Sequence, residues 1–147
     1  MGALSLVNLG LGGRSRGYPF GIQRAALVFM ARDHRKLDAF KLADELAMAV
    51  YLASSDFPPN ERYGLQSQLR RAAVSVPTNI GEGSARESQG DYLRFLDIAL
   101  GSAREALYLM TIAKRLSLLE SNDARHLEEL GDRVAGALTN LRRSLRT

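Results

Sequence analysis

Apolar residues recur at spacings of three and four along most of this chain after about residue 33, and this period predicts helices. Four such segments follow one another, at about 37–54, 60–81, 88–119 and 121–146. No useful length alternates apolar and polar residues with the period of two that marks a β-strand. Short links between long helices favour antiparallel neighbours. The sequence therefore predicts an all-α protein, folded as an antiparallel up-and-down four-helix bundle.

The second segment carries a proline inside its helical pattern. Its apolar side is formed by Leu69, Ala72, Ala73, Val76 and Ile80. Pro77 lies among these residues, where it removes a backbone donor and costs about 3 kcal/mol in an ordinary helix. We therefore predict that the second helix bends at Pro77, or that one helical stretch ends there. Gly81 and Gly83 then predict a turn that needs the backbone freedom of glycine.

Polar residues occupy the other side of this segment and form what we call the polar stripe. Its members are Arg71, Ser75, Thr78, Asn79 and Glu82. One interpretation is a solvated face. The other is that Arg71 and Glu82 join polar contacts around the bend or across a subunit boundary. We favour a structural role, because small polar side chains permit close approach of helices.

The third segment is apolar on two sides. One stripe comprises Tyr92, Leu96, Ala99, Ala103, Leu107 and Met110. The second stripe comprises Phe95, Ile98, Ser102, Ala106, Leu109 and Ala113. A helix with so wide an apolar arc is buried from more than one direction. Either it is the central element of the bundle, or its second stripe meets another subunit.

The positive charge of the chain is confined to its first part. The net charge of the 147 residues is +4, and residues 1–32 hold four arginines and no acidic residue, whereas residues 33–147 sum to zero. We expect a basic leader over residues 1–32 and the bundle over residues 33–147. A signal peptide and a mitochondrial-type presequence are alternatives for the leader. We favour a flexible extension, upstream of a natural start at Met30.

Composition limits the location and the chemistry. The chain has no cysteine, which excludes disulfides, thiolate nucleophiles and cysteine-ligated metals. It has no run of the roughly 20 apolar residues that cross a bilayer, so we expect no membrane contact and a cytoplasmic location.

Two stretches resemble a known family. QLRRAAVSVPTNIGEG, which begins at Gln68, and DYLRFLDIALGSAREA, at Asp91 to Ala106, resemble the four-helix-bundle family of 23S rRNA-intervening-sequence proteins. The resemblance covers roughly residues 33–143. It implies an antiparallel bundle that assembles into a ring-shaped homopentamer. It also implies a relationship to accessory variability proteins of diversity-generating retroelements, which associate with reverse transcriptase and nucleic acid.

Candidates for catalysis are few. His34 and His126 are the only histidines, and the Glu-x-x-His pairs of di-iron bundles are absent. Residues 79–83 lack the lysine and the preceding strand of a phosphate-binding loop. Three acids near a predicted helix start are better explained by the helix dipole: Glu82, Glu87 and Asp91. We expect no enzyme activity, no cofactor and no metal site, and a nuclease is only a remote alternative.

Arginines on the second and third segments are the candidates for binding RNA or DNA, because a guanidinium can contact a phosphate through two donors. They are Arg70, Arg71, Arg86, Arg94 and Arg104, with Tyr92 and Phe95 near them for stacking. Neighbouring acids within a Debye length of about 8–10 Å oppose this charge. The sequence thus predicts a self-associating scaffold for RNA, DNA or a nucleic-acid-handling protein. The alternative is a purely structural homo-oligomer without affinity for nucleic acid.

Overall fold

The computed structural model describes residues 32–146, and our predictions for residues 1–31 lie outside this range. The described part contains four α-helices and two short 3-10 turns, and it has no strand. In chain order these are η1 (His34–Lys36), α2 (Asp38–Ala53), η2 (Pro59–Glu61), α3 (Leu65–Ser84), α4 (Gln89–Arg115) and α5 (Ser121–Arg146). The predicted all-α class is confirmed.

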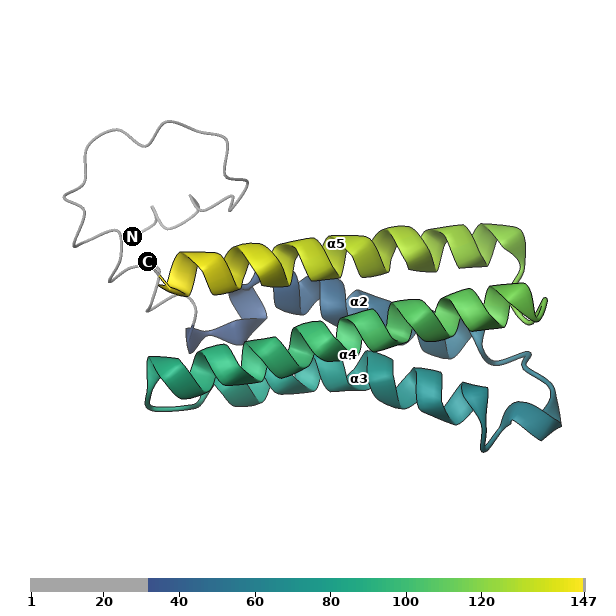
Figure 1. Ribbon diagram of the computed structural model, residues 1–147, viewed down its shortest axis with the longest axis horizontal. Helices are drawn as coiled ribbons and strands as arrows, with labels where there is room; N and C mark the ends of the chain where they lie inside the picture. The colour runs from purple at the N-terminus through teal and green to yellow at the C-terminus, as the bar shows by residue number, and fades with distance from the viewer. Residues whose placement is uncertain (1–31, 147) are drawn as a thin grey trace, which may run out of the picture.

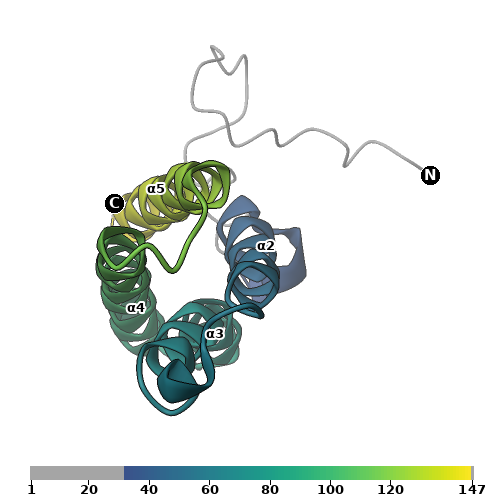
Figure 2. The same cartoon turned by 90° about the vertical axis from the view of Figure 1, so that its right-hand side faces the viewer.

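The helices form an antiparallel up-and-down bundle. Each one packs along its length against two others: α2 and α4 both contact α3 and α5 (Figures 1 and 2). In the end-on view of Figure 2, α2 and α4 consequently stand at diagonal corners. This placement leaves the outer faces of α2 and α4 pointing to opposite sides of the molecule.

The core follows the predicted apolar sides. All five apolar residues predicted for the proline-bearing helix are buried, and so is the leucine-rich side of α5. On α4, Ala106, Leu109 and Ala113 of the second stripe are also buried. The wide apolar arc of α4 is thus explained in large part by its contacts with both α3 and α5. Phe95, Ile98 and Ser102 of that stripe remain half-buried or exposed.

Local hydrogen bonds fix where α4 begins and where it ends. The Ser88 hydroxyl accepts a hydrogen bond from the Asp91 backbone N–H at 3.0 Å, which confirms the predicted helix start. At the other end Ser117 adopts a left-handed backbone with φ of 57°. The Leu118 N–H then donates to the Ala113 carbonyl at 2.9 Å, and the Ser117 N–H donates to Lys114 at 3.0 Å. This pair of bonds is a Schellman motif and stops α4 at Arg115.

Helix α3 does not end at Pro77, because it continues without interruption to Ser84. Polar side chains bond to the preceding turn beside the proline. Thr78 donates to the Val74 carbonyl at 2.8 Å, and Asn79 donates to the Ser75 carbonyl at 2.7 Å. The predicted bend at Pro77 stays a prediction.

The turn that we predicted at Gly81 and Gly83 is wrong, since both residues lie within α3 and neither has a positive φ. Gly83 instead marks a close approach of two helices. A Cβ placed on Gly83 would lie 2.7 Å from the Cβ of Phe95 and 2.9 Å from a ring carbon of Tyr92. The glycine is therefore needed for its missing side chain and not for its backbone freedom.

Candidate nucleic-acid and assembly surfaces

Arg70 is committed to contacts inside the bundle. Its Nε donates to the Ser54 hydroxyl at 2.8 Å, and its guanidinium also donates to the Tyr51 carbonyl at 3.3 Å and lies 4.5 Å from the centre of the Tyr51 ring. Gln66 donates to the Ser54 carbonyl at 2.6 Å. Ser54 is fully buried at the end of α2. Arg70 and Gln66 of α3 thus cap the C-terminus of α2, and Arg70 is not free to contact a phosphate.

The other candidate arginines do not converge on one site. Arg86 is exposed just after α3, and its guanidinium lies 4.5 Å from the centre of the Phe95 ring. Arg71, Arg94 and Arg104 are exposed, and none of them makes a hydrogen bond or ion pair with another described residue. Arg71 belongs to α3, whereas Arg94 and Arg104 belong to α4. Arg71 and Arg86 stay available as ligands for an anion along α3.

The polar stripe contributes to the contact between α3 and α4. The Ser75 and Ser102 hydroxyls are 2.9 Å apart across the two helices, and Asn79 also donates to the Ser75 hydroxyl at 3.0 Å. Small side chains at these positions let the helices approach each other, as the structural interpretation requires. Arg71 and Glu82 are exposed at the two ends of the stripe and are not joined to each other. A role for them across a subunit boundary stays a prediction.

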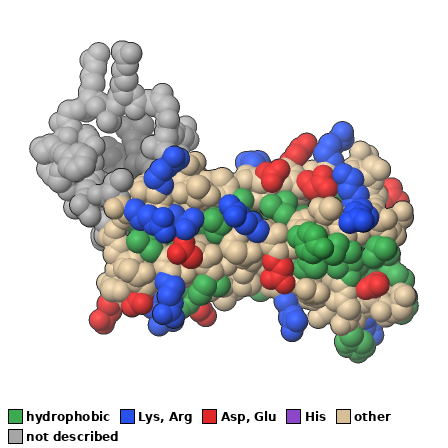
Figure 3. Space-filling model, in the orientation of Figure 1, with side chains coloured by type: hydrophobic (Ala, Val, Ile, Leu, Met, Phe, Trp, Pro, Cys, Tyr) green, Lys and Arg blue, Asp and Glu red, His purple; other side chains and the backbone are tan. Residues whose placement is uncertain are grey.

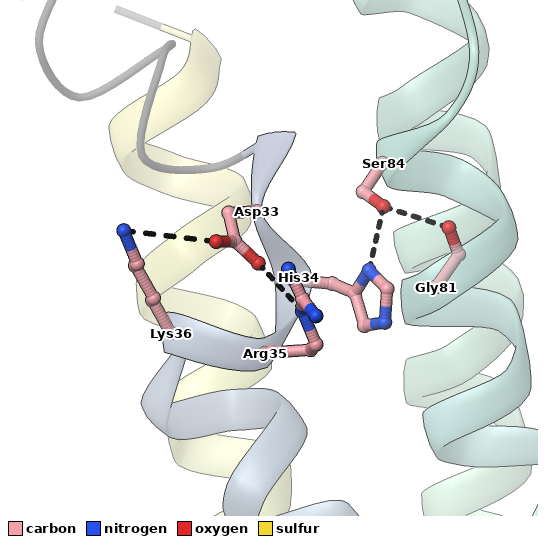
Figure 4. A network of polar contacts seen from close by, with 6 residues as sticks. All are labelled: Asp33, His34, Arg35, Lys36, Gly81 and Ser84. Atoms are coloured by element: carbon pink, nitrogen blue, oxygen red, sulfur yellow. Dashed lines mark hydrogen bonds and ion pairs between the residues drawn. The ribbon is translucent and has the colours of Figure 1, made fainter.

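The segment before α2 is fastened to the end of α3 (Figure 4). Arg32, which we had assigned to the leader, donates to the Ser84 carbonyl at 3.3 Å and to the Glu87 carbonyl at 3.1 Å. His34 Nδ1 lies 3.3 Å from the buried Ser84 hydroxyl, which itself donates to the Gly81 carbonyl at 2.7 Å. The bonds to Ser84 and Gly81 satisfy carbonyls that the last turn of α3 leaves free. The histidine therefore has a structural role in this arrangement.

Asp33 makes two ion pairs within the same segment. Its carboxylate contacts Arg35 Nε at 3.2 Å and Lys36 Nζ at 3.7 Å (Figure 4). The hydrogen bond from Arg35 lowers the pKa of Asp33 below its usual value. These pairs are largely exposed, so their contribution to stability is small.

Tyr92 is the largest fully buried side chain, and burial raises its pKa to about 12, against the opposing charge of Arg32. The folded protein therefore holds the phenol proton between pH 10 and pH 12, where the unfolded chain loses it. Stability from this group is fully present below pH 10 and falls as the pH rises to about 12, by roughly 2–3 kcal/mol in total.

Urea unfolding at pH 9 and pH 12 tests this expectation. The wild-type protein should lose more unfolding free energy between the two pH values than the Tyr92→Phe variant, which has no proton to lose. Tyr63→Phe is the matched control, because Tyr63 is 90% exposed and should leave the pH dependence unchanged. Equal losses in the wild type and in Tyr92→Phe would refute the expectation.

Apolar side chains remain on the outer face of α4. Ile98, Tyr108 and Leu116 are 44%, 63% and 58% exposed, and Ile112 between the last two is partly exposed. Tyr108, Ile112 and Leu116 follow at intervals of four, which aligns them along one side of the helix. Hydrophobic side chains gather over the C-terminal half of α4 in Figure 3. Ile98 belongs to the second predicted stripe, whereas Tyr108, Ile112 and Leu116 lie outside both predicted stripes.

Basic side chains also gather along the last part of α5 (Figure 3). Arg142 forms an ion pair with Asp97 of α4, and Arg146 lies 3.8 Å from the same carboxylate oxygen. Arg143 is exposed beside them and donates to Asn140 at 2.6 Å. Arginines in the last turn of a helix also interact favourably with the helix dipole. The structure adds that Arg142 links α5 to α4 and that Arg143 adds an exposed positive charge.

The remaining histidine, His126, is exposed on α5 and lines a shallow hollow between α2 and α5. Its neighbour Glu128 pairs with Lys114 of α4 at 3.3 Å. Within residues 32–146, no three His, Asp or Glu side chains gather as metal ligands would. None of the helices in this range combines the length and the hydropathy needed to cross a bilayer.

Comparisons with known proteins agree with this architecture. A crystal structure from Bacteroides thetaiotaomicron, of a protein of unknown function from the S23 ribosomal protein family, superimposes with a TM-score of 0.62 at 16% identity. The match covers 80% of this chain and 98% of that protein, and at this identity it supports the fold alone. No curated protein matches. The sequence model of the 23S rRNA-intervening sequence proteins matches residues 35–140. The chain is therefore a member of the 23S rRNA-intervening sequence protein family.

Proposed function

We propose that this protein is a non-enzymatic, self-associating four-helix bundle that acts in the cytoplasm as a scaffold for RNA or DNA. The observation that carries the proposal is the apolar outer face of α4, where Ile98, Tyr108 and Leu116 stay exposed although the bundle is complete. An exposed row of large apolar residues marks a surface for association. Another copy of the chain would remove this surface from water, at roughly 25 cal/mol for each Å² covered.

The ring-shaped homopentamer that the family resemblance implies is the assembly we propose. A ring repeats any ligand-binding surface once in every copy. A nucleic acid that contacts several copies then binds more tightly than one copy allows, because each further contact is intramolecular.

The proposed contact with nucleic acid lies along α3. Arg71 is exposed in the first half of α3 and Arg86 just after its end, and the hydroxyl and amide groups of the polar stripe lie between them. Guanidinium groups donate to phosphate oxygens, and the Phe95 ring holds the Arg86 guanidinium from one side. Glu82 lies on the same stretch and opposes an anion. We therefore expect weak binding by one copy and useful affinity only in the assembled ring.

A purely structural oligomer is the second candidate, and one observation favours it. Arg70 caps α2 and Arg142 pairs with Asp97, so two arginines that could have contacted phosphate are engaged inside the chain. Under this second function the assembly forms without any affinity for nucleic acid. A binding measurement separates the two candidates.

Fluorescence anisotropy with labelled single-stranded RNA and DNA tests the nucleic-acid proposal. Affinity should fall steeply between 50 and 200 mM salt, since binding releases counterions in proportion to the phosphates contacted. Arg71→Glu combined with Arg86→Glu should weaken binding at least tenfold. Arg62→Glu, an exposed arginine before α3, is the control and should change it little.

Removal of residues 1–29 should leave most of the affinity. If the deletion abolishes binding, the leader is its source and the α3 surface is wrong. If the full chain does not bind RNA or DNA at low salt, the purely structural function is the correct one.

A further inference from the structure

We propose that the outer face of α2 in one copy docks against the outer face of α4 in the next copy, head to tail. This inference rests on the proposed self-association and specifies which surfaces make it. A contact between two different surfaces of the same protein is heterologous. It gives a closed ring when the rotations from one copy to the next add up to a full turn. Because α2 and α4 occupy diagonal corners of the bundle, each copy offers the two patches on opposite sides (Figure 2).

The first patch lies on α2 and is both apolar and acidic. Met48 and Leu52 are 59% and 72% exposed and stand one turn apart on the outer side. Asp44 and Glu45 are exposed one turn earlier on the same helix. We call Asp44, Glu45, Met48 and Leu52 the α2 patch.

The second patch lies on α4 and is apolar and basic. It consists of the exposed Tyr108 and Leu116, the partly exposed Ile112 between them, and the exposed Arg94 and Arg104, and we call these five residues the α4 patch. Arg104, Tyr108, Ile112 and Leu116 follow at intervals of four, and Arg94 lies five whole turns before Ile112, so the five residues lie on one side of the helix. Both patches thus combine apolar side chains in the later part of the helix with charges in the earlier part.

The charges of the two faces are opposite. The exposed charges of α2 are three acids against one lysine: Asp38, Asp44, Glu45 and Lys41. The outer face of α4 has three arginines, Arg94, Arg104 and Arg115, against two acids, Glu105 and Asp97, and Asp97 is paired with Arg142 of α5. None of the other eight side chains makes a hydrogen bond or ion pair with another described residue. Opposite charge steers the two faces together, and like charges disfavour pairing of a face with itself.

The two patches also lie at the same height in the bundle. Ser54, at the end of α2, is bonded by Gln66 and Arg70 of α3, and Ser75 of α3 contacts Ser102 of α4. Because α3 runs antiparallel to α4, residues that precede Ser75 on α3 are level with residues that follow Ser102 on α4. At a rise of about 1.5 Å per residue, Ser54 is therefore level with about residue 107–109 of α4. Leu52 therefore stands within about one turn of Tyr108.

Heights along the earlier part of each helix match as well. Asp44 and Glu45 lie about 14–15 Å before Ser54, which places them level with about residues 97–100 of α4, between Arg94 and Arg104 and about one to two turns from each. Arginine side chains in a helix point toward its N-terminus, so the Arg104 guanidinium reaches toward that level. A ring of identical copies has no axial shift, and these equal heights are what such a ring requires.

A shallow hollow beside the α2 patch offers a place for one large side chain. It is lined by Ala49, Leu52, Ala53, Asp123, His126 and Leu127, where α2 meets α5. Tyr108 is the largest exposed side chain of the α4 patch and lies at about this height. We assign Tyr108 of the neighbouring copy to this hollow, where its ring would lie on Leu52.

Mixing two blocked variants of the full chain tests the contact. The α2-blocked variant carries Met48→Arg and Leu52→Arg, and the α4-blocked variant carries Tyr108→Glu and Ile112→Glu. Each should be a 16.1 kDa monomer by light scattering at a concentration where the wild type is assembled. An equimolar mixture should give a dimer of about 32 kDa, because one intact patch of each kind remains and the pair cannot extend. Arg125→Glu with Arg133→Glu on α5 is the control and should keep the wild-type mass.

Other outcomes overturn the contact. If either blocked variant keeps the wild-type mass, or if the mixture stays monomeric, these faces are not the two halves of one interface. Charge reversal at Asp44 and Glu45, and separately at Arg94 and Arg104, repeats the test with unchanged apolar residues, and circular dichroism verifies folding of all variants. A monomeric wild type would instead refute the proposed self-association itself, which distinguishes the two failures.

Discussion

Replacement of Gly83 by alanine is expected to destabilise the protein by about 1–3 kcal/mol, although alanine is the better helix former. The added Cβ would meet the Cβ of Phe95 at 2.7 Å and the Tyr92 ring at 2.9 Å. Phe95 Cβ belongs to the stem of its side chain and cannot rotate away. Helices α3 and α4 would therefore have to move apart, which is the cost of overpacking a closely packed contact.

Gly136→Ala is the matched control for this prediction. Gly136 lies inside α5, and a Cβ placed there meets nothing within 4 Å. The same substitution should therefore stabilise the protein by up to about 1 kcal/mol through helix propensity. Urea unfolding of both variants measures the two effects. If Gly83→Ala stabilises the protein as Gly136→Ala does, the close approach of α3 and α4 at Gly83 is wrong.

Replacement of Arg70 by methionine is expected to lower the free energy of unfolding by about 2–3 kcal/mol. It removes the charged donor to the buried Ser54 hydroxyl and to the Tyr51 carbonyl, and hydrogen bonds to charged groups contribute about 1.5–3 kcal/mol. It also removes the stacking of the guanidinium on the Tyr51 ring. Methionine keeps most of the apolar stem, so that lost packing contributes little.

The neighbouring Arg71→Met substitution separates this role from a general effect of charge. Arg71 is exposed and makes no hydrogen bond or ion pair with another described residue, so its replacement should change stability by no more than about 0.5 kcal/mol. Chemical unfolding of the two variants gives the comparison. Similar losses for both would mean that the cap on α2 contributes nothing measurable.

The number, order and buried sides of the helices could be predicted from the sequence, because spacings of three and four report directly which residues face a core. The start of α4 was predictable because its capping residues are close in sequence: Ser88 and Asp91 form their hydrogen bonds within one turn. The second helix begins later than predicted, since the chain first makes the 3-10 turn η2 and Glu61 then accepts a bond from the Leu65 N–H at 2.9 Å.

What the sequence could not show depends on contacts between distant segments. Gly83 looked like a turn residue, because nothing in the local pattern reveals that Phe95 and Tyr92 pack against it. Arg70 looked like a surface cation, since its partner Ser54 lies 16 residues earlier. The same limit applied to α4, where burial by both neighbouring helices decided which apolar residues stay exposed. Only the packed bundle identifies Tyr108 and Leu116 as the exposed ones.

Light scattering of the purified full chain at micromolar concentration tests the central claim, that exposed apolar surface on α4 drives self-association. The proposed ring of five 16.1 kDa copies should give a mass of about 80 kDa, and the mass should fall toward one copy when Tyr108 and Ile112 are replaced by glutamate. A wild-type mass of 16.1 kDa at that concentration would contradict the account.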